Sequence, residues 1–482
     1  MINFLFQILV VNIQLIISNS LMKGRKESRN VLASYGQVSQ SYLSIRYGIL
    51  YVTPWSWRCK LYCNGANCKY CSWKSWSLKE QAIRGLYSSW ITRNIVAMSR
   101  PTVKTFTDDN LIAQFQKANI CAVINLQMLG EHDSCGPELL PSGFTYNPEI
   151  LMQNGIQFYN FVWPDFGALG IDILLDIVKV VHCSLRQGKV AIHCHAGLGR
   201  TGVVIAAYMI WAEHFTYTEA ISRVRTARPN SVQSRKQIRM VKDFGMFLEK
   251  HGAALPHEAG MVHLNDYMHM QVKILSSSQA RKYHHIPKVL HAAMEELLLV
   301  VHGELDGRTR QWITNVLKCT SKIDREFLER WPARLPIPSK VKSQEIDICI
   351  CGVMENCGEI LDSSCKDAKI IKNGAFQMNN CTKFIRNNFR GNMLLLLRTL
   401  DQLMNSFIKP IIPKEEILGD LRRNNQHADW QCLNRYLLIT MASLSSGNYM
   451  NIAKLISRWY LGESANDDNK ITVTLQNQLQ RA

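Results

Sequence analysis

The chain is short of acidic residues, with 38 Asp and Glu against 56 Lys and Arg in 482 positions and a formal charge of +18. This imbalance favours anionic partners, such as phosphorylated proteins, acidic lipids or nucleic acid. No nucleic-acid-binding module is found, and the Lys and Arg are scattered along the chain, so nucleic acid is not expected as a partner. Long low-complexity tracts and internal repeats are missing too. With 47% hydrophobic residues, the composition is that of a folded protein of two or three domains.

A positively charged start is also missing. Residues 1–18 are mostly apolar, but Asn and Gln interrupt them, no basic residue precedes them, and their length is marginal for a membrane span. We therefore interpret residues 1–50 as an N-terminal extension or a packed helix, with a targeting or anchoring segment as the alternative. A membrane location is not expected.

The fifteen cysteines do not form the dense framework of a small secreted domain, because they are odd in number and spread over a long chain. This favours reduced thiols in a cytoplasmic or nuclear protein. Four of them fall within 13 residues of the Cys- and Trp-rich segment 51–77, in the spacing C-x3-C-x4-C-x2-C. They are a candidate zinc site, with reduced structural or surface thiols as the alternative; the four are Cys59, Cys63, Cys68 and Cys71.

From residue 78 to residue 250, apolar runs of strand and helix type alternate, which predicts an α/β domain with a central sheet flanked by helices. Residues 251–482 have mostly helical periodicity, with a loop or linker predicted at 335–390. This helical region either packs on the α/β domain or carries interactions with partners. The predicted strands are 120–127, 156–163 and 189–194, and the predicted helices of the α/β domain are 171–188, 201–214, 218–228 and 234–250.

Residues 190–202 read V-A-I-H-C-H-A-G-L-G-R-T-G, a strand that runs into a glycine-rich turn and then a helix. The turn matches the dinucleotide pattern G-x-G-x-x-G, but no second strand with a terminal acidic residue follows, and no Walker A lysine is present. The stretch 193–201 instead fits the cysteine-phosphatase signature His-Cys-x-x-Gly-x-x-Arg-Thr without a gap. Cys194 is then the nucleophile, and its alternative is an inert buried thiol.

The residue types of this turn suit phosphate chemistry. Backbone N–H groups at a helix N-terminus bind oxyanions and, with nearby positive charge, lower the pKa of a cysteine. Arg200 would hold two phosphate oxygens, Thr201 would donate a hydrogen bond to the thiolate, and His193 would support the base of the turn. The residues expected to surround the phosphate are His195, Ala196, Gly197, Leu198 and Gly199.

Two further groups are needed for turnover. The leaving oxygen must be protonated, and Asp165 in Trp-Pro-Asp-Phe-Gly is placed after a predicted strand, where a closing loop could deliver it; the alternative is an ordinary Pro-Asp turn. Gln233 and Gln237 are candidates for holding the water that hydrolyses the phosphocysteine, or else are surface residues at a helix start. This route needs no metal or cofactor.

The sequence resembles the protein tyrosine phosphatase domain-containing protein family, which is related to the mitotic-exit dual-specificity phosphatases. The segments that carry the resemblance lie within residues 55–250; they are QAIRGLYSSWITRNIVAMSRP, VINLQMLGEHDSCG, GFTYNPEILMQNGIQFYNFVWPDFG, KVAIHCHAGLGRTG and ARPNSVQSRKQ. The resemblance implies a cysteine-dependent protein phosphatase with Cys194, Arg200 and Asp165 in the catalytic positions. It also implies association with centrosomes or the base of cilia, with a role in cilium biogenesis and partners that bind the helical region.

The substrate is expected to be a phosphoprotein, with phosphotyrosine and phosphoserine or phosphothreonine both open. The phosphoinositide phosphatases that resemble this chain carry Lys in the variable positions of the turn, where His195, Ala196 and Leu198 stand here. The alternatives are a phosphoinositide phosphatase and a catalytically weak phospho-binding scaffold that acts through its helical region. Met128 and Leu129 depart from the Arg-Pro expected in the family, which indicates a different substrate rim.

Overall fold

A computed structural model describes residues 63–165, 169–256, 260–303, 307, 339–355, 376–412, 417, 428–445, 449–462 and 469–481. The chain divides into two compact units, one of residues 1–69 with 132–138 and the other of residues 70–131 with 139–482. The predicted extension 1–50 lies outside the described residues. The boundary predicted at residue 250 falls inside the second unit, so the α/β domain and the helical region share one unit.

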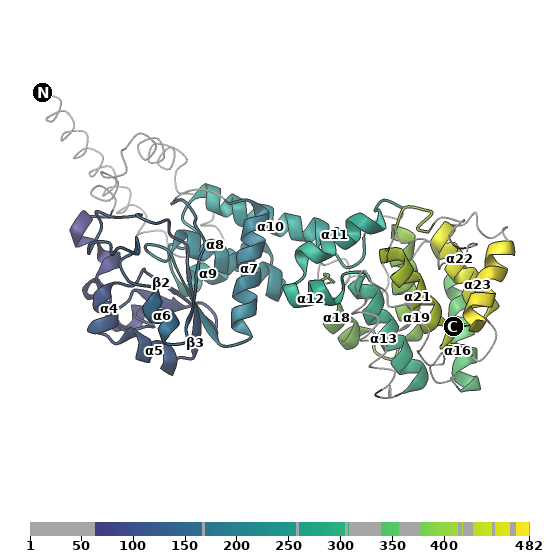
Figure 1. The fold of residues 1–482 in the computed structure, drawn as a ribbon. Helices are drawn as coiled ribbons and strands as arrows, with labels where there is room; N and C mark the ends of the chain where they lie inside the picture. Colours follow the sequence, from purple (N-terminus) through teal and green to yellow (C-terminus); the bar gives the residue numbers. More distant parts are fainter. Residues whose placement is uncertain are drawn as a thin grey trace, which may run out of the picture. The chain divides into compact units, whose positions relative to one another are not determined.

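The sheet of the second unit has five strands in the order β1-β2-β5-β3-β4 (Figure 1). β1 pairs antiparallel with β2, and the other neighbours are parallel. β5, which leads into the glycine-rich turn, therefore lies at the centre of the sheet. The strand bounds are β1 Ser88–Trp90, β2 Ile95–Met98, β3 Ile120–Asn125, β4 Gln157–Asn160 and β5 Lys189–His193.

Helices cover both faces of this sheet, as Figure 1 shows for α4 to α6 on one side and α7 to α10 on the other. The inner strands β2, β3 and β5 are mostly apolar on both faces for this reason. In β5, Val190 and Ile192 join the core under α7 and α8, whereas Ala191 joins a second core with Phe115 of α5. The helices of this part are α4 Val103–Thr107, α5 Leu111–Lys117, α6 Glu149–Gln153, α7 Ile171–Leu185, α8 Gly199–Glu213, α9 Tyr217–Ala227 and α10 Arg235–His251, with the short 3-10 helices η3 Trp73–Ser75 and η4 Leu78–Glu80. The 3-10 helix η1 Gly65–Asn67 belongs to the first unit, and η2 Lys69–Cys71 begins at its last residue before the boundary.

The region after residue 251 is helical in its described parts, as predicted. Its helices are α11 Leu264–Ile274, α12 Ser277–Lys282, α13 Lys288–His302, α16 Lys340–Glu355, α18 Cys381–Asn388, α19 Met393–Ser406, α21 Ala428–Ala442, α22 Met450–Leu461 and α23 Asn469–Arg481. The predicted loop at 335–390 is wrong where α16 and α18 occur. In α16 the residues Ile346, Ile350 and Val353 are buried at helical spacing, a short apolar stripe among many polar and Cys residues.

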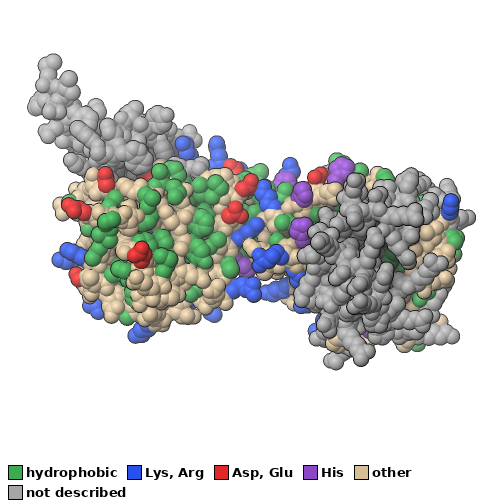
Figure 2. All heavy atoms as spheres, viewed as in Figure 1, with side chains coloured by type: hydrophobic (Ala, Val, Ile, Leu, Met, Phe, Trp, Pro, Cys, Tyr) green, Lys and Arg blue, Asp and Glu red, His purple; other side chains and the backbone are tan. Residues whose placement is uncertain are grey.

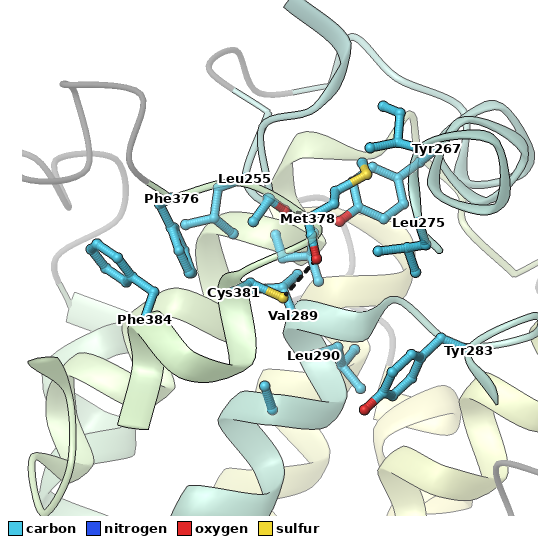
Figure 3. Close-up of a cluster of buried hydrophobic side chains, with 14 of the residues drawn as sticks. Leu255, Tyr267, Leu275, Tyr283, Val289, Leu290, Phe376, Met378, Cys381 and Phe384 are labelled. Atoms are coloured by element: carbon cyan, nitrogen blue, oxygen red, sulfur yellow. Dashed lines mark hydrogen bonds between the residues drawn. The ribbon is translucent and has the colours of Figure 1, made fainter. Parts of the chain in front are cut away.

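The helical region packs on the α/β part of the same unit. Trp211 of α8 donates from Nε1 to the Ile274 carbonyl at 2.9 Å, and the Met378 N–H donates to the Gly252 carbonyl at 2.8 Å. Figure 3 shows part of the buried cluster beyond this contact, to which Tyr267, Leu290 and Phe384 belong. The helical region therefore packs on the α/β part, and the binding of partners by this region stays a prediction.

The surface agrees only in part with the expectation of scattered charge. On the face drawn in Figure 2, Lys and Arg side chains gather in the middle of the view, with few Asp and Glu beside them. Among the described residues, no helix combines the length and the apolar character needed to cross a bilayer.

Candidate active site

The glycine-rich turn joins the C-terminal end of the central strand β5 to the N-terminus of α8, and Cys194 is its first residue. Both flanking elements are buried, and Cys194 itself is only 4% exposed. A helix N-terminus that opens directly above a thiol provides unpaired N–H groups and the positive end of the helix dipole. The predicted strand-turn-helix context of Cys194 is thus present.

Gly197 allows the turn to approach the neighbouring strand. Its φ is +65°, and a Cβ on it would lie 2.0 Å from the carbonyl oxygen of Met98 at the end of β2. No other residue could take this position without moving the backbone. The glycine therefore fixes how closely the turn lies against the sheet.

The carbonyls of the turn are all engaged with donors that come from other parts of the chain or from α8. The acceptors are the carbonyls of residues 195, 196, 197 and 198, and their donors are the N–H of Arg100, the guanidinium of Arg228 and the N–H groups of Gly202 and Val232. With its carbonyls directed outward, the turn directs its N–H groups to the inside of the loop. This is the concave nest that binds a phosphate-sized anion.

Arg228 at the end of α9 holds much of this arrangement, a role that the sequence analysis missed. Its Nε donates to the Gly197 carbonyl at 2.6 Å and its Nη2 to the Ala196 carbonyl at 3.0 Å. It also reaches Ser89 and the carbonyl of Tyr87, whose ring it covers at 3.8 Å. Burial lowers the pKa of Arg228 to about 10, so that it still carries its charge at neutral pH.

His193 supports the base of the turn through two hydrogen bonds. Its Nδ1 lies 3.1 Å from the Cys194 carbonyl, and its Nε2 lies 2.8 Å from the hydroxyl of Tyr146. Because a carbonyl can only accept, Nδ1 carries the proton and Nε2 accepts from Tyr146. Burial lowers the pKa of His193 to about 3, which keeps the ring neutral. The structural role predicted for His193 is consistent with these bonds.

Arg200 is buried in the first turn of α8 and lies against two carboxylates. Its Nη1 donates to Glu131 Oε2 at 2.7 Å, its Nη2 pairs with Glu131 Oε1, and Nη2 also lies 3.2 Å from Asp165 Oδ1. Nη1 is shared with the carbonyls of Leu126 and Trp163. Although burial opposes it, these carboxylates raise the pKa of Arg200 above its usual value.

Glu131 is the second residue that the sequence analysis missed. It is 7% exposed and grips both terminal nitrogens of Arg200, which fixes the plane of the guanidinium. It lies in the segment LGEHDSCG, which carries the family resemblance but contains no motif that would assign a role to Glu131. A carboxylate whose partner is 69 positions away leaves no local pattern by which to assign it.

Two buried donors in the first turn of α8, shortly after Cys194 in the sequence, lack a hydrogen-bond acceptor in the described part of the chain. They are Arg200 Nε and Thr201 Oγ1. The bond predicted from Thr201 to the Cys194 thiol is therefore not formed in this structure. Buried donors without acceptors are costly, so both are suited to an arriving anion.

His195 departs from the role predicted for it. Its side chain is 5% exposed, its Nε2 lies 3.6 Å from the Cys71 sulfur, and its ring meets the edge of Tyr70. The Arg100 guanidinium also lies 3.6 Å from this sulfur. His195 thus contacts other side chains of the protein, which leaves its backbone as its contribution to the turn.

Gln233 and Gln237, the two candidates for holding the water, both lie beside Gly199 of the turn. A Cβ on Gly199 would come within 2.7 Å of Gln237 Nε2 and 3.1 Å of Gln233 Oε1. Gln237 is buried and its Oε1 accepts from the N–H groups of Gln233 and Ser234 at the start of α10, whereas Gln233 is exposed. The two amides are therefore not equivalent.

Comparison with known proteins finds phosphatases that are similar to the part of the chain that contains this site. Residues 105–246 match the family described as "Dual specificity phosphatase, catalytic domain". Relatives named "Protein tyrosine phosphatase domain-containing protein 1" from Bos taurus and Danio rerio are each 43% identical, over 55% and 53% of this chain and 34% and 37% of their own. "Tyrosine-protein phosphatase CDC14" of Saccharomyces cerevisiae is 34% identical over 19% of this chain and 17% of its own.

These findings confirm the resemblance seen in the sequence. Residues 105–246 are similar to a dual-specificity phosphatase catalytic domain, and the fold around them is of that type, with a mixed sheet flanked by helices and a helix-rich region after it. The chain spans about a third of the length of the first two relatives.

Proposed function

We propose that this chain is a protein phosphatase that hydrolyses phosphotyrosine, and phosphoserine or phosphothreonine, through a phosphocysteine intermediate. The observation that carries the proposal is the 3.2 Å contact between Asp165 and Arg200. It brings an acid and a phosphate-binding group together at the turn that begins with Cys194. A site that only bound phosphate would have no need of the acid.

In the first step the Cys194 thiolate attacks phosphorus. An S–P bond forms while the P–O bond to the substrate breaks, and protonated Asp165 gives its proton to the leaving oxygen. The inward N–H groups of the turn, with Nε of Arg200, stabilise the charge on the remaining phosphate oxygens. The substrate phosphate competes with the Asp165 carboxylate for Arg200, so that its arrival releases Asp165 from this ion pair.

In the second step water hydrolyses the S–P bond, and Asp165, now ionised, takes one proton from that water. The water's other proton needs an acceptor if a lone pair is to face phosphorus. The Oε1 of Gln237 already accepts from two backbone N–H groups, so we assign this task to Gln233. Gln237 then acts on the start of α10, where it keeps Gln233 in place.

A phosphoprotein is favoured over a phosphoinositide because the variable positions of the turn add no cation. His195 is turned toward Cys71 and Tyr70, and Ala196 and Leu198 are uncharged. At the turn, an inositol ring with several phosphates would meet Arg200 and backbone N–H groups, with no Lys or Arg at the variable positions 195, 196 and 198. The purified protein should therefore hydrolyse phosphopeptides faster than soluble inositol phosphates, and the reverse order would contradict the substrate class.

Association with centrosomes or the base of cilia, through partners of the helical region, is part of the proposal. It is supported by the sequence resemblance alone. A tagged full chain should concentrate at these structures in ciliated cells and remain in the cytoplasm elsewhere, and a diffuse signal in both would remove this part.

The decisive experiment measures turnover of para-nitrophenyl phosphate and of a phosphotyrosine peptide by the full chain. Cys194→Ser should abolish both activities, and Asp165→Asn should lower peptide hydrolysis by about 10²–10⁴-fold, with a smaller loss for the nitrophenyl ester because its leaving group needs less protonation. Asp172→Asn, at an exposed position of α7, is the matched control and should keep both activities. A wild-type protein no faster than Cys194→Ser would make the chain a phosphate-binding scaffold.

A further inference from the structure

The first unit contains, among its described residues, two short segments that are far apart in the sequence. They are residues 63–69, C-N-G-A-N-C-K, and residues 132–138, H-D-S-C-G-P-E. We call them together the Cys-His module. Neither segment contains a Leu, Ile, Val, Met, Phe, Tyr or Trp, so these segments supply no hydrophobic core of their own.

The module gathers three thiols and one imidazole. Cys63 Sγ lies 3.9 Å from His132 Nδ1, and these two groups and Cys135 Sγ all lie within 4.8 Å of one another. Cys68 Sγ is also within 4.8 Å of Cys135 Sγ. In a tetrahedral zinc site, with Zn–S near 2.3 Å and Zn–N near 2.0 Å, ligand atoms are about 3.5–3.8 Å apart. Cys63, His132 and Cys135 need to approach one another by up to about 1 Å to reach this geometry, and Cys68, which lies near Cys135, would supply the fourth ligand.

The backbone is shaped to bring these ligands inward. Asn64 and Gly65 have φ of 64° and 54°, and the Gly65 carbonyl accepts from the Cys68 N–H and the Gly136 N–H, both at 3.1 Å. The Cys135 N–H donates to the His132 carbonyl at 3.2 Å. Two tight turns, each with a ligand at either end, are thus joined to each other by one backbone hydrogen bond.

The burial and the chemistry of these side chains point to a metal. Cys68 and Cys135 are 1% and 0% exposed, so their thiols are grouped away from solvent. Short segments without large apolar side chains can be held together by a metal. Three thiolates with one neutral imidazole match the structural Cys3His class, since soft ligands in a tetrahedron select Zn2+ over hard cations.

We propose that Cys63, Cys68, His132 and Cys135 bind one structural Zn2+ ion. Such a site has four protein ligands and no open position for catalysis. It keeps two of the four cysteines predicted from spacing. Of the other two, Cys59 lies outside the described residues, and the Cys71 sulfur lies near His195 and Arg100.

The test is the zinc content of the full chain, measured by mass spectrometry of the metal after dialysis against buffer without metal. We expect about one equivalent per chain, and less than a tenth of an equivalent in Cys135→Ala and in His132→Ala. Cys183→Ala, at an exposed cysteine outside the module, is the matched control and should keep the metal. Wild-type protein without zinc, or zinc retained in Cys135→Ala, would overturn the proposal.

A second pair of measurements guards against simple misfolding of these variants. His132→Cys should retain about one equivalent, because four thiolates also close a tetrahedral site. With Co2+ in place of Zn2+, the wild type should show the visible bands of tetrahedral cobalt with thiolate charge transfer, and His132→Cys should shift them. If instead Cys71→Ala loses the metal while Cys63→Ala keeps it, the ligand set proposed here is wrong.

Discussion

Two buried arginine–carboxylate pairs, one in the α/β part and one in the helical region, have the same chemistry but different surroundings. Arg200 pairs with Glu131, and Arg458 of α22 pairs with Asp401 of α19 at 2.6 Å. All four side chains are at most 5% exposed. The difference between the pairs lies in what else each guanidinium touches.

The terminal nitrogens of Arg458 donate to groups of the helical region itself. Its Nη1 and Nη2 reach the carbonyls of Met354 and Val353 in the last turn of α16, while Asp401 also accepts from Trp459 Nε1 at 2.9 Å. This pair therefore ties three helices together and caps one of them. Arg200 also donates to backbone carbonyls, but in addition it meets a second carboxylate, that of Asp165, at 3.2 Å. A guanidinium that holds two carboxylates can exchange one of them for a phosphate, whereas the Arg458 guanidinium holds the Asp401 carboxylate and joins helices.

The largest effect is expected from replacing the two arginines by lysine. Arg200→Lys should lower kcat/KM for a phosphotyrosine peptide by about 10²–10³-fold, because a point charge cannot face Glu131 and the phosphate together. Arg458→Lys should leave kcat/KM of the folded protein unchanged. Steady-state kinetics on both variants check this, and an Arg200→Lys enzyme with more than a tenth of wild-type activity would make the two pairs equivalent.

Removing a single carboxylate sharpens the comparison through stability. Asp401→Leu should lower the free energy of unfolding by about 3–5 kcal/mol, because it leaves Arg458 buried without its counter-charge. The double variant Asp401→Leu/Arg458→Met should recover most of that loss. The corresponding double variant Glu131→Leu/Arg200→Met should be more stable than Glu131→Leu alone but should not hydrolyse the phosphotyrosine peptide. Urea unfolding and peptide turnover, measured on all variants, separate the two roles.

The third effect is a loss of folding stability at acidic pH. Burial lowers the pKa of His193 in the catalytic part and of His291 in the helical region to about 3, from an ordinary 6.5. The unfolded chain therefore binds these protons first, and the stability that the neutral rings contribute is complete above pH 6.5 and is lost as the pH falls toward 3. Between pH 6.5 and 5 each ring should cost about 2 kcal/mol, at 1.36 kcal/mol per pH unit. Urea midpoints across this range, with His291→Leu removing one share, test the sign.

The smallest effect distinguishes these two histidines at neutral pH. Neither ring nitrogen of His291 has a hydrogen-bond partner in the described part of the chain, and the ring stacks on Tyr436 at 5.8 Å. His291→Leu should therefore change the free energy of unfolding by no more than about 1 kcal/mol. His193→Leu should cost more, since it leaves the Tyr146 hydroxyl buried without its acceptor. Equal losses in thermal unfolding would show that the bonds of His193 add nothing.

Much of the α/β part can be predicted from the sequence, because the periodicity of each strand or helix and the residues of the signature are close together along the chain. The strands β3, β4 and β5 and the helices α7 to α10 lie within or near the predicted ranges, and the signature around Cys194 is contiguous. The short strands β1 and β2 could not be found, because three or four residues carry no period. Glu131 and Arg228 act on residues 69 and 31 positions away, and such pairings exist only once the chain has folded.

The grip of Arg228 on the turn has a consequence for how the protein is made. The strand, Cys194 and the start of α8 are all synthesised before residue 228, yet the carbonyls of Ala196 and Gly197 lack their partner until it arrives. A nascent or truncated chain that ends before this residue would hold Cys194 without a formed anion nest. Under the proposed function, fragments that end before Arg228 should therefore have no activity toward phosphate esters.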